Sequence, residues 1–387
     1  MSEDLQALLD HLLNVLDPDR QDEIEQRHIR ALNWEPTDRL PVIVTLREPR
    51  ELSFTPYPHG EVFENPEKML FNELVYAFNT SIASRDLFGD DLPCTIRANL
   101  GTVIIPSMFG ACVEQIGYNP PWIRHNDNGD IHLEKVLDHD PLDFSKGWCP
   151  KVVQMCQFYR SVLSDYPKLK QLIRVTLPDL QGPFDNLELV VGSDVFIELY
   201  TRPDLVSKAL AAMATAQIGF ARHIEPYISD KPDTFSHQHA TMIKGRILLR
   251  NDSVIMMSPE TYRSMVAPHD EQVMQELGGG AIHSCGKVDS HVPAFLELPS
   301  LRCIHLGQPE LNNIDELYLQ LEKRHIPLAR VKVSREDLAS ARIMDRFPTG
   351  LSLLFEADSV RDVKETLDAY LRAAEMRSTS QTKEYLP

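Results

Sequence analysis

The stretch Ala281-Ile282-His283-Ser284-Cys285-Gly286 decides the fold, because it places a reactive pair at the end of a short apolar strand. The glycine run 278–280 leads into this stretch and Gly286 ends it, a pattern typical of a buried strand between two turns. Side chains two residues apart on a strand lie on the same face, so His283 and Cys285 stand side by side. Barrel enzymes keep their chemistry at this end of their strands.

Similar strand-like segments recur along the chain and most are followed by helical patterns. The strand-like segments are 41–46, 172–176, 246–249, 281–285, 302–305, 327–331 and 351–355. The clearest helices are expected at 202–224, 259–276 and 359–377. Alternating strands and helices predict a parallel sheet. For a chain of 387 residues we expect an α/β fold, a closed (β/α)8 TIM barrel, with an open doubly wound sheet as the alternative.

Two regions are expected to elaborate this barrel. Residues 1–35 read as an N-terminal helical extension, with helices at 2–16 and 22–32, and residues 36–387 as the barrel itself. The leucine stripe of the first helix suggests a packing extension or a contact in a homodimer. The proline-rich segment 88–150 predicts an insertion over the barrel mouth.

Composition and charge exclude several classes of function. The formal net charge of −18 repels a nucleic-acid backbone or an anionic membrane surface. No apolar run approaches the length of a membrane span, and the acidic N-terminus lacks the pattern of a secretory signal. The six cysteines are dispersed, which is typical of a reduced compartment, so we expect a cytoplasmic protein.

Polar residues follow the expected end of nearly every strand. Because parallel strands end at one rim, we expect these side chains to converge on a single site. They are Arg47 and Glu48; Asp179 and Gln181; His237 and His239; Asn251 and Asp252; His283 and Cys285; His305, Gln308 and Glu310; and Glu356.

The His283 and Cys285 pair predicts a zinc site. Zinc takes sulfur, nitrogen and carboxylate oxygen ligands, and a catalytic site keeps one position open. A third ligand must come from another strand, and Glu356 is the first choice, with His305 and then Cys303 as alternatives. The competing interpretation is that these cysteines are small buried apolar groups and the histidines hydrogen-bonded core residues.

Several segments together resemble the uroporphyrinogen decarboxylase superfamily. The resemblance extends over nearly the whole chain and implies a (β/α)8 barrel. The segments are Arg30-Ala-Leu-Asn-Trp-Glu-Pro-Thr-Asp-Arg-Leu-Pro-Val42, Gln181-Gly-Pro-Phe184, Tyr200-Thr-Arg-Pro-Asp204, Arg250-Asn-Asp-Ser253, Met257-Ser-Pro-Glu260 and Ile282-His-Ser-Cys-Gly286.

The resemblance is nearer to the methyltransferase branch of that superfamily than to its decarboxylases. Decarboxylases carry an R-Q-A-G-R-Y segment near the first strand, where this chain keeps only Arg47 and Arg50. Corrinoid-linked methyltransferases hold zinc with H-x-C and a distant cysteine on the last strand. His283 and Cys285 match that pair, but Glu356 stands in the region of the last cysteine. A carboxylate in place of a thiolate favours an oxygen or nitrogen methyl donor.

The leading hypothesis is therefore a zinc-dependent methyltransferase that works with a corrinoid on a separate protein. His283, Cys285 and Glu356 would hold zinc, His305 or Glu310 would move a proton, and Asp252 would orient the substrate. The expected substrate-binding residues are Arg47, Asp179, Gln181, His239 and Asn251. One alternative is a metal-independent decarboxylase or lyase using Arg47, Arg50 and Asp179, and another is a non-catalytic barrel that binds a ligand.

Overall fold

A parallel sheet of six strands forms the centre of the molecule. The computed structural model describes residues 1–46, 54–77, 89–115, 117, 119–124, 131–230, 234–238 and 241–384. The order is β1-β12-β11-β10-β9-β8, and neighbouring strands pair in parallel. The bounds are β1 (Val42–Leu46), β8 (Ile247–Arg250), β9 (Gly280–Ser284), β10 (Leu301–Leu306), β11 (Leu328–Lys332) and β12 (Leu351–Ala357). The prediction of a parallel α/β sheet is confirmed.

Two short strands and a few hydrogen bonds lie between the edges of this sheet. Strands β2 (Thr95–Ile96) and β5 (Arg174–Val175) pair in parallel. Gly182 N donates to Arg250 O over 2.8 Å, and Asp91 N donates to Val42 O over 2.7 Å. These bonds reach both edge strands, β8 and β1, and are consistent with a TIM-like arrangement. The fully closed eight-stranded barrel stays a prediction, because the parallel ladders among the described residues form an open sheet and this separate pair.

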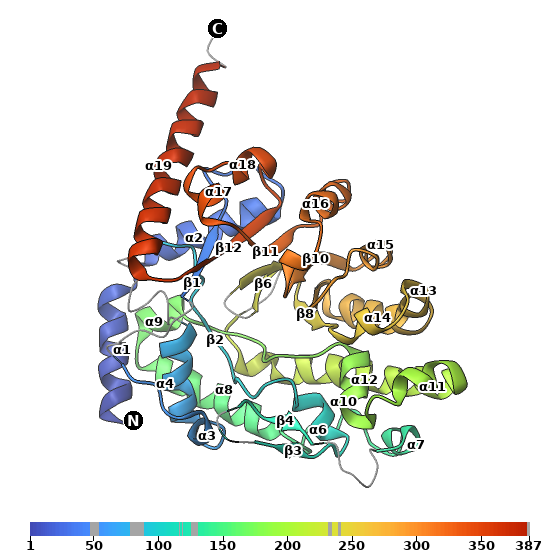
Figure 1. Ribbon diagram of the computed structural model, residues 1–387. Coiled ribbons are helices and arrows are strands. Elements are labelled where there is room, and N and C mark those ends of the chain that lie inside the picture. The colour runs from blue at the N-terminus through green and yellow to red at the C-terminus, as the bar shows by residue number, and fades with distance from the viewer. Residues whose placement is uncertain are drawn as a thin grey trace.

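Helices lie outside the strands, which surround a common centre (Figure 1). The longer ones are α4 (Pro66–Ala77), α8 (Cys149–Ser164), α10 (Pro183–Val191), α12 (Pro203–Ile224), α14 (Ala267–Leu277), α16 (Ile314–Glu322) and α19 (Val360–Glu384). The shorter ones are α3 (His59–Val62), α9 (Pro167–Leu172), α11 (Val195–Thr201), α13 (Pro259–Thr261), α15 (Val292–Leu296), α17 (Arg335–Ala339) and α18 (Ile343–Arg346). Among the described residues, no helix is both long and apolar enough to cross a membrane.

The N-terminal extension packs onto the rest of the chain. It consists of α1 (Glu3–Val15) and α2 (Pro18–Leu32), close to the predicted bounds. The leucine stripe of α1 is buried, with Leu5, Leu9 and Leu12 fully inaccessible, and α1 contacts α4 and α9. The stripe is therefore a packing surface within the chain and gives no support to a homodimer. The homodimer stays a prediction.

Two further segments, 88–150 and 259–276, contain more elements than the sequence predicted. Region 88–150 contributes strand β2 as well as α6 (Ile104–Met108), α7 (Leu133–Val136) and the antiparallel pair β3 (Val113–Glu114) and β4 (Trp122–Ile123). The helix expected at 259–276 is interrupted by a π-helical turn, η3 (Tyr262–Val266). Pro268 stands just after that turn and has no N–H to continue the α-helical ladder, which accounts for the break.

An apolar layer lies on the inner face of the sheet. Its members are Ile243, Leu248, Ala281, Cys303 and Ala329, all buried. Ile243 comes from the hairpin of β6 (Phe235–Gln238) and β7 (Thr241–Lys244), and the others come from four adjacent strands. Because strand side chains alternate between faces, the residues two positions further along these strands face the same interior. Those residues begin the candidate site.

Candidate metal centre

Three side chains are aligned across neighbouring strands above the apolar layer. Arg250 of β8 pairs in register with His283 of β9, and His283 pairs with His305 of β10. The two histidine rings lie so close that their Nδ1 atoms are 2.6 Å apart. One ring nitrogen must carry a proton and the other must accept it. His305 therefore fixes the orientation of the His283 ring.

The other nitrogen of His283 faces a thiol and a carboxylate. Its Nε2 lies 3.5 Å from Cys285 Sγ and 3.5 Å from Asp252 Oδ1. The backbone N–H of Cys285 donates to the same carboxylate oxygen over 2.7 Å. The three ligand-type atoms all lie within 4.8 Å of one another. The structure thus brings together one nitrogen, one sulfur and one oxygen donor.

This donor set fits a metal ion with one open position. Zinc bonds of about 2.0–2.1 Å to nitrogen or oxygen and about 2.3 Å to sulfur imply tetrahedral edges of roughly 3.3–3.6 Å. The separations of 3.5 Å from His283 Nε2 to each of the other two donors agree with those edges. The Asp252 side chain is 40% exposed, so the group is open to a fourth ligand from outside.

The imidazole of His283 and the thiol of Cys285 are both neutral at pH 7. Burial lowers the pKa of His283 to about 4, which leaves its ring uncharged at neutral pH. Burial, reinforced by the Asp252 carboxylate, raises the pKa of the Cys285 thiol to about 12. Burial also holds the pKa of His305 well below its ordinary value, with the neighbouring His283 adding to the effect. A neutral imidazole is ready to bind a metal, whereas the thiol must first lose its proton.

A buried carboxylate holds Asp252 in place. Asp185, in the first turn of α10, accepts the backbone N–H groups of Asp252 and Ser253 over 2.8 and 3.0 Å. The Ser253 hydroxyl donates to the same oxygen over 3.1 Å. Burial raises the pKa of Asp185 well above its ordinary value. Asp185 was missed by the sequence analysis, since an acidic residue after Pro183 is also ordinary at a helix N-terminus.

The third predicted ligand, Glu356, lies outside this group. Its carboxylate is 2.8 Å from Lys332 Nζ on the adjacent strand, and Asp252 takes the third position beside His283 and Cys285. Cys303, the weakest alternative, is buried in the apolar layer two residues before His305. Glu310 and Glu356 instead line a pocket of about 760 Å³ beyond the ends of β11 and β12.

The predicted substrate-binding residues differ in where the structure places them. Asp179 is held by Arg250 and Arg97, at 2.7 and 3.2 Å from its Oδ1, near the candidate site. Gln181 is buried, and its position forms a parallel bridge with Arg250. Asn251 is fully buried and donates to Asp270 over 2.6 Å, so its side chain has a structural role. Arg47 and His239 lie outside the described residues.

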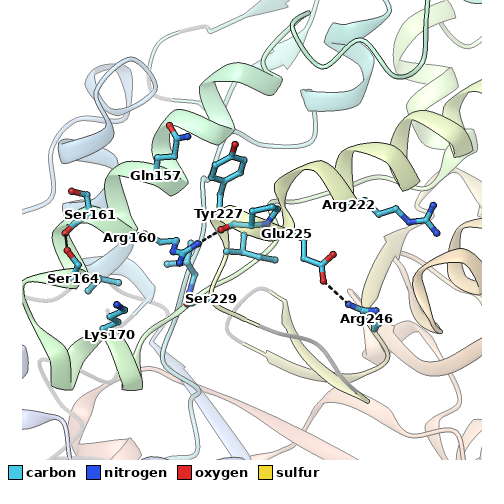
Figure 2. A pocket seen from close by; sticks show the side chains of 14 residues that line it. Gln157, Arg160, Ser161, Ser164, Lys170, Arg222, Glu225, Tyr227, Ser229 and Arg246 are labelled. Carbon is cyan, nitrogen blue, oxygen red and sulfur yellow. Dashed lines mark hydrogen bonds and ion pairs between the residues drawn. The ribbon is translucent and has the colours of Figure 1, made fainter.

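A larger pocket lies at the other end of the strands. It measures about 940 Å³ and is lined by α8, α9, the end of α12 and Arg246, which precedes β8, whereas Asp252 follows that strand. Figure 2 shows two of its cations engaged with the protein: Arg246 binds Glu225 at 3.3 Å, and Arg160 binds the Pro226 carbonyl. A third, Arg222, binds Glu276 at 2.8 Å. We therefore place the candidate chemistry at the metal group and not in this pocket.

Comparisons with known proteins support the fold. No family model matches this chain, and no curated protein matches it. Among solved structures, a methyltransferase from Methanosarcina mazei superposes with a TM-score of 0.63. The match covers 92% of this chain and 99% of the other, at 16% sequence identity. A likeness at this level of identity establishes a shared fold and leaves the activity to be argued from the site.

Replacing Asp185 by alanine should weaken metal binding. Without its buried carboxylate, the turn that carries Asp252 loses three hydrogen bonds, and supporting residues of this kind affect metal affinity by about 10–100-fold. We expect a loss in that range, measured as the zinc dissociation constant by competition with a chelator. Asp138→Ala, at an exposed site, is the matched control and should bind zinc like the wild type. Unchanged affinity in Asp185→Ala would show that Asp252 needs no such support.

Zinc binding at pH 7 should release about one proton per ion, as expected when a protonated thiol becomes a ligand. The sign follows from the two pKa values: the Cys285 thiol is protonated below about pH 12, and His283 is already neutral above about pH 4. Calorimetry in buffers of different ionisation enthalpy measures the number released. His283→Ala should still release the proton, although it binds zinc more weakly. Release of no proton by the wild type would exclude Cys285 as a ligand.

Proposed function

We propose that the protein is a zinc-dependent methyltransferase that moves a methyl group between a small O- or N-methylated substrate and a corrinoid on a separate protein. The observation that carries the proposal is the group of Asp252, His283 and Cys285, with its open side. The structural likeness to a methyltransferase is compatible with it. The likeness of the His-x-Cys pair to that of corrinoid-linked enzymes supports the choice of partner.

Each residue of the site has a distinct part in this proposal. Asp252, His283 and Cys285 would hold zinc, and His305 would keep the His283 ring turned towards it by a hydrogen bond between the Nδ1 atoms. When bound there, zinc supplies a Lewis acid for the oxygen or nitrogen that carries the methyl group. Asp252 fills the place that Glu356 was expected to take, and its carboxylate gives the same preference for a hard donor atom.

Methyl transfer requires polarisation of the bond between the methyl carbon and the heteroatom, and a proton for the heteroatom that is released. In the direction away from the substrate, the bond between the methyl carbon and the heteroatom breaks and the methyl carbon passes to the corrinoid, which in its reduced Co(I) state would supply the electron pair of the new bond. The heteroatom keeps the electron pair and takes up a proton. Glu310, which lines the pocket beyond the ends of β11 and β12, is the proposed source of that proton.

A metal-free lyase acting on an anionic substrate is the second candidate. The observation that favours it is the buried ion-pair cluster in which Arg97 and Arg250 both contact Asp179. It differs from the first proposal in needing no metal. Metal content therefore separates the two candidates.

Purified protein should contain about one zinc per chain, because three donors converge on one position. Cys285→Ser should lose the metal, whereas Cys112→Ser, at an exposed cysteine, should keep it. Elemental analysis of the three proteins, purified in parallel, measures this. The zinc-loaded wild type should also transfer methyl groups from methoxylated or methylated amine donors to free cob(I)alamin, followed by the absorbance of methylcobalamin. Wild type without metal, and with no transfer, would overturn the proposal in favour of the lyase.

A further inference from the structure

Arg330 interrupts the regular pairing of strand β11. Its φ angle is 58°, in the left-handed region that non-glycine residues rarely adopt. On either side of it, Leu328 pairs with Leu351 and Val331 with Leu353, so β11 holds one more residue than its partner. Its backbone N–H donates to the Ser352 hydroxyl over 2.9 Å. Bulges of this kind redirect a side chain, and strained residues in them are common at functional sites.

The side chain of Arg330 lies close to the candidate metal centre. The residue before it, Ala329, pairs in register with His305. After burial, which is the main cause, the positive charge of Arg330 contributes to the lowered pKa values of His283 and His305. Arg330 is only partly buried, so part of its side chain is open to solvent.

No hydrogen bond or close ion pair among the described residues engages the guanidinium of Arg330, and the Glu356 carboxylate attracts it only at longer range. Its Nε is buried without a hydrogen-bond partner, and none of the ion pairs among these residues includes it. The neighbouring cations are engaged: Arg97 and Arg250 bind Asp179, and Lys332 binds Glu356. A buried N–H donor without a partner is costly, so an acceptor supplied from outside would stabilise the site.

We infer that Arg330 binds a carboxylate of the substrate, so that the molecule that takes part in methyl transfer is a small methylated acid. The planar guanidinium matches the two oxygens of a carboxylate. A carboxylate on Arg330 would hold the rest of the molecule next to the His283–Cys285–Asp252 group. The methyl-transfer part of this statement rests on the proposed function, whereas carboxylate binding by Arg330 does not.

The test compares small acids with their amides as ligands. Acetate, methoxyacetate and benzoate, and the amide of each, are titrated by calorimetry and by thermal shift into the wild type and into Cys285→Ser. The Cys285→Ser protein removes direct coordination of the probes by zinc. We expect at least one acid to bind at least tenfold more tightly than its amide in both proteins. Arg330→Gln should abolish that preference, Arg330→Lys should keep part of it, and Arg342→Gln, at an exposed ion-paired arginine, should leave it intact.

Two results would overturn the inference. One is that none of the acids binds more tightly than its amide, and the other is that Arg330→Gln binds the acids as the wild type does. The proposed function fails separately. A protein that prefers acids through Arg330 but holds no zinc would refute the methyltransferase and leave the carboxylate site standing. A zinc protein without this preference would do the reverse.

Discussion

The parallel register of β8, β9 and β10 is the constraint on which the candidate site depends. It aligns Arg250, His283 and His305 across three strands, directly above an apolar layer contributed by the same strands. A shift of one residue in any of these ladders would turn its polar side chain away from the interior. The reactive side chains are thus positioned by backbone hydrogen bonds between the strands, and these bonds do not involve the side chains themselves.

The site combines this rigid part with a supported turn. His283 and Cys285 follow from strand geometry, but Asp252 comes from the segment after β8 and depends on the buried Asp185 for its position. Without a metal the thiol and both imidazoles are neutral, so these three side chains add no charge to the interior. Metal binding would convert the thiol to a thiolate. It would thereby add the charges of the thiolate and the metal ion next to the surrounding arginines.

Much of the fold was predictable from the sequence, because apolar segments of strand length alternate with amphipathic helices. The same-face pair His283 and Cys285 was predictable from spacing alone. The third donor was not. Glu356 ends the last strand as expected but faces Lys332, whereas Asn251-Asp252-Ser253 reads equally well as ordinary turn chemistry. The role of Asp252 depends on Asp185, 67 residues away, and no local pattern reveals that contact.

Arg330 illustrates a second limit on sequence reasoning. The segment Pro327-Leu-Ala-Arg-Val331 reads as a regular strand, and nothing in it predicts a left-handed residue or an extra residue in the ladder. The bulge arises from the pairing of two distant strands. It places a cation whose buried Nε has no hydrogen-bond partner, among the described residues, near a group of metal-type donors. A substrate that carries both a methylated heteroatom and a carboxylate would satisfy both features at once.

The most direct test of the central claim is the zinc K-edge X-ray absorption spectrum of protein loaded with one zinc per chain. We predict a single sulfur ligand at about 2.3 Å with the remaining nitrogen and oxygen ligands at about 2.0–2.1 Å. The sulfur contribution should disappear in Cys285→Ser. A spectrum without sulfur, or with two or more sulfur ligands, would contradict a centre built from Asp252, His283 and Cys285.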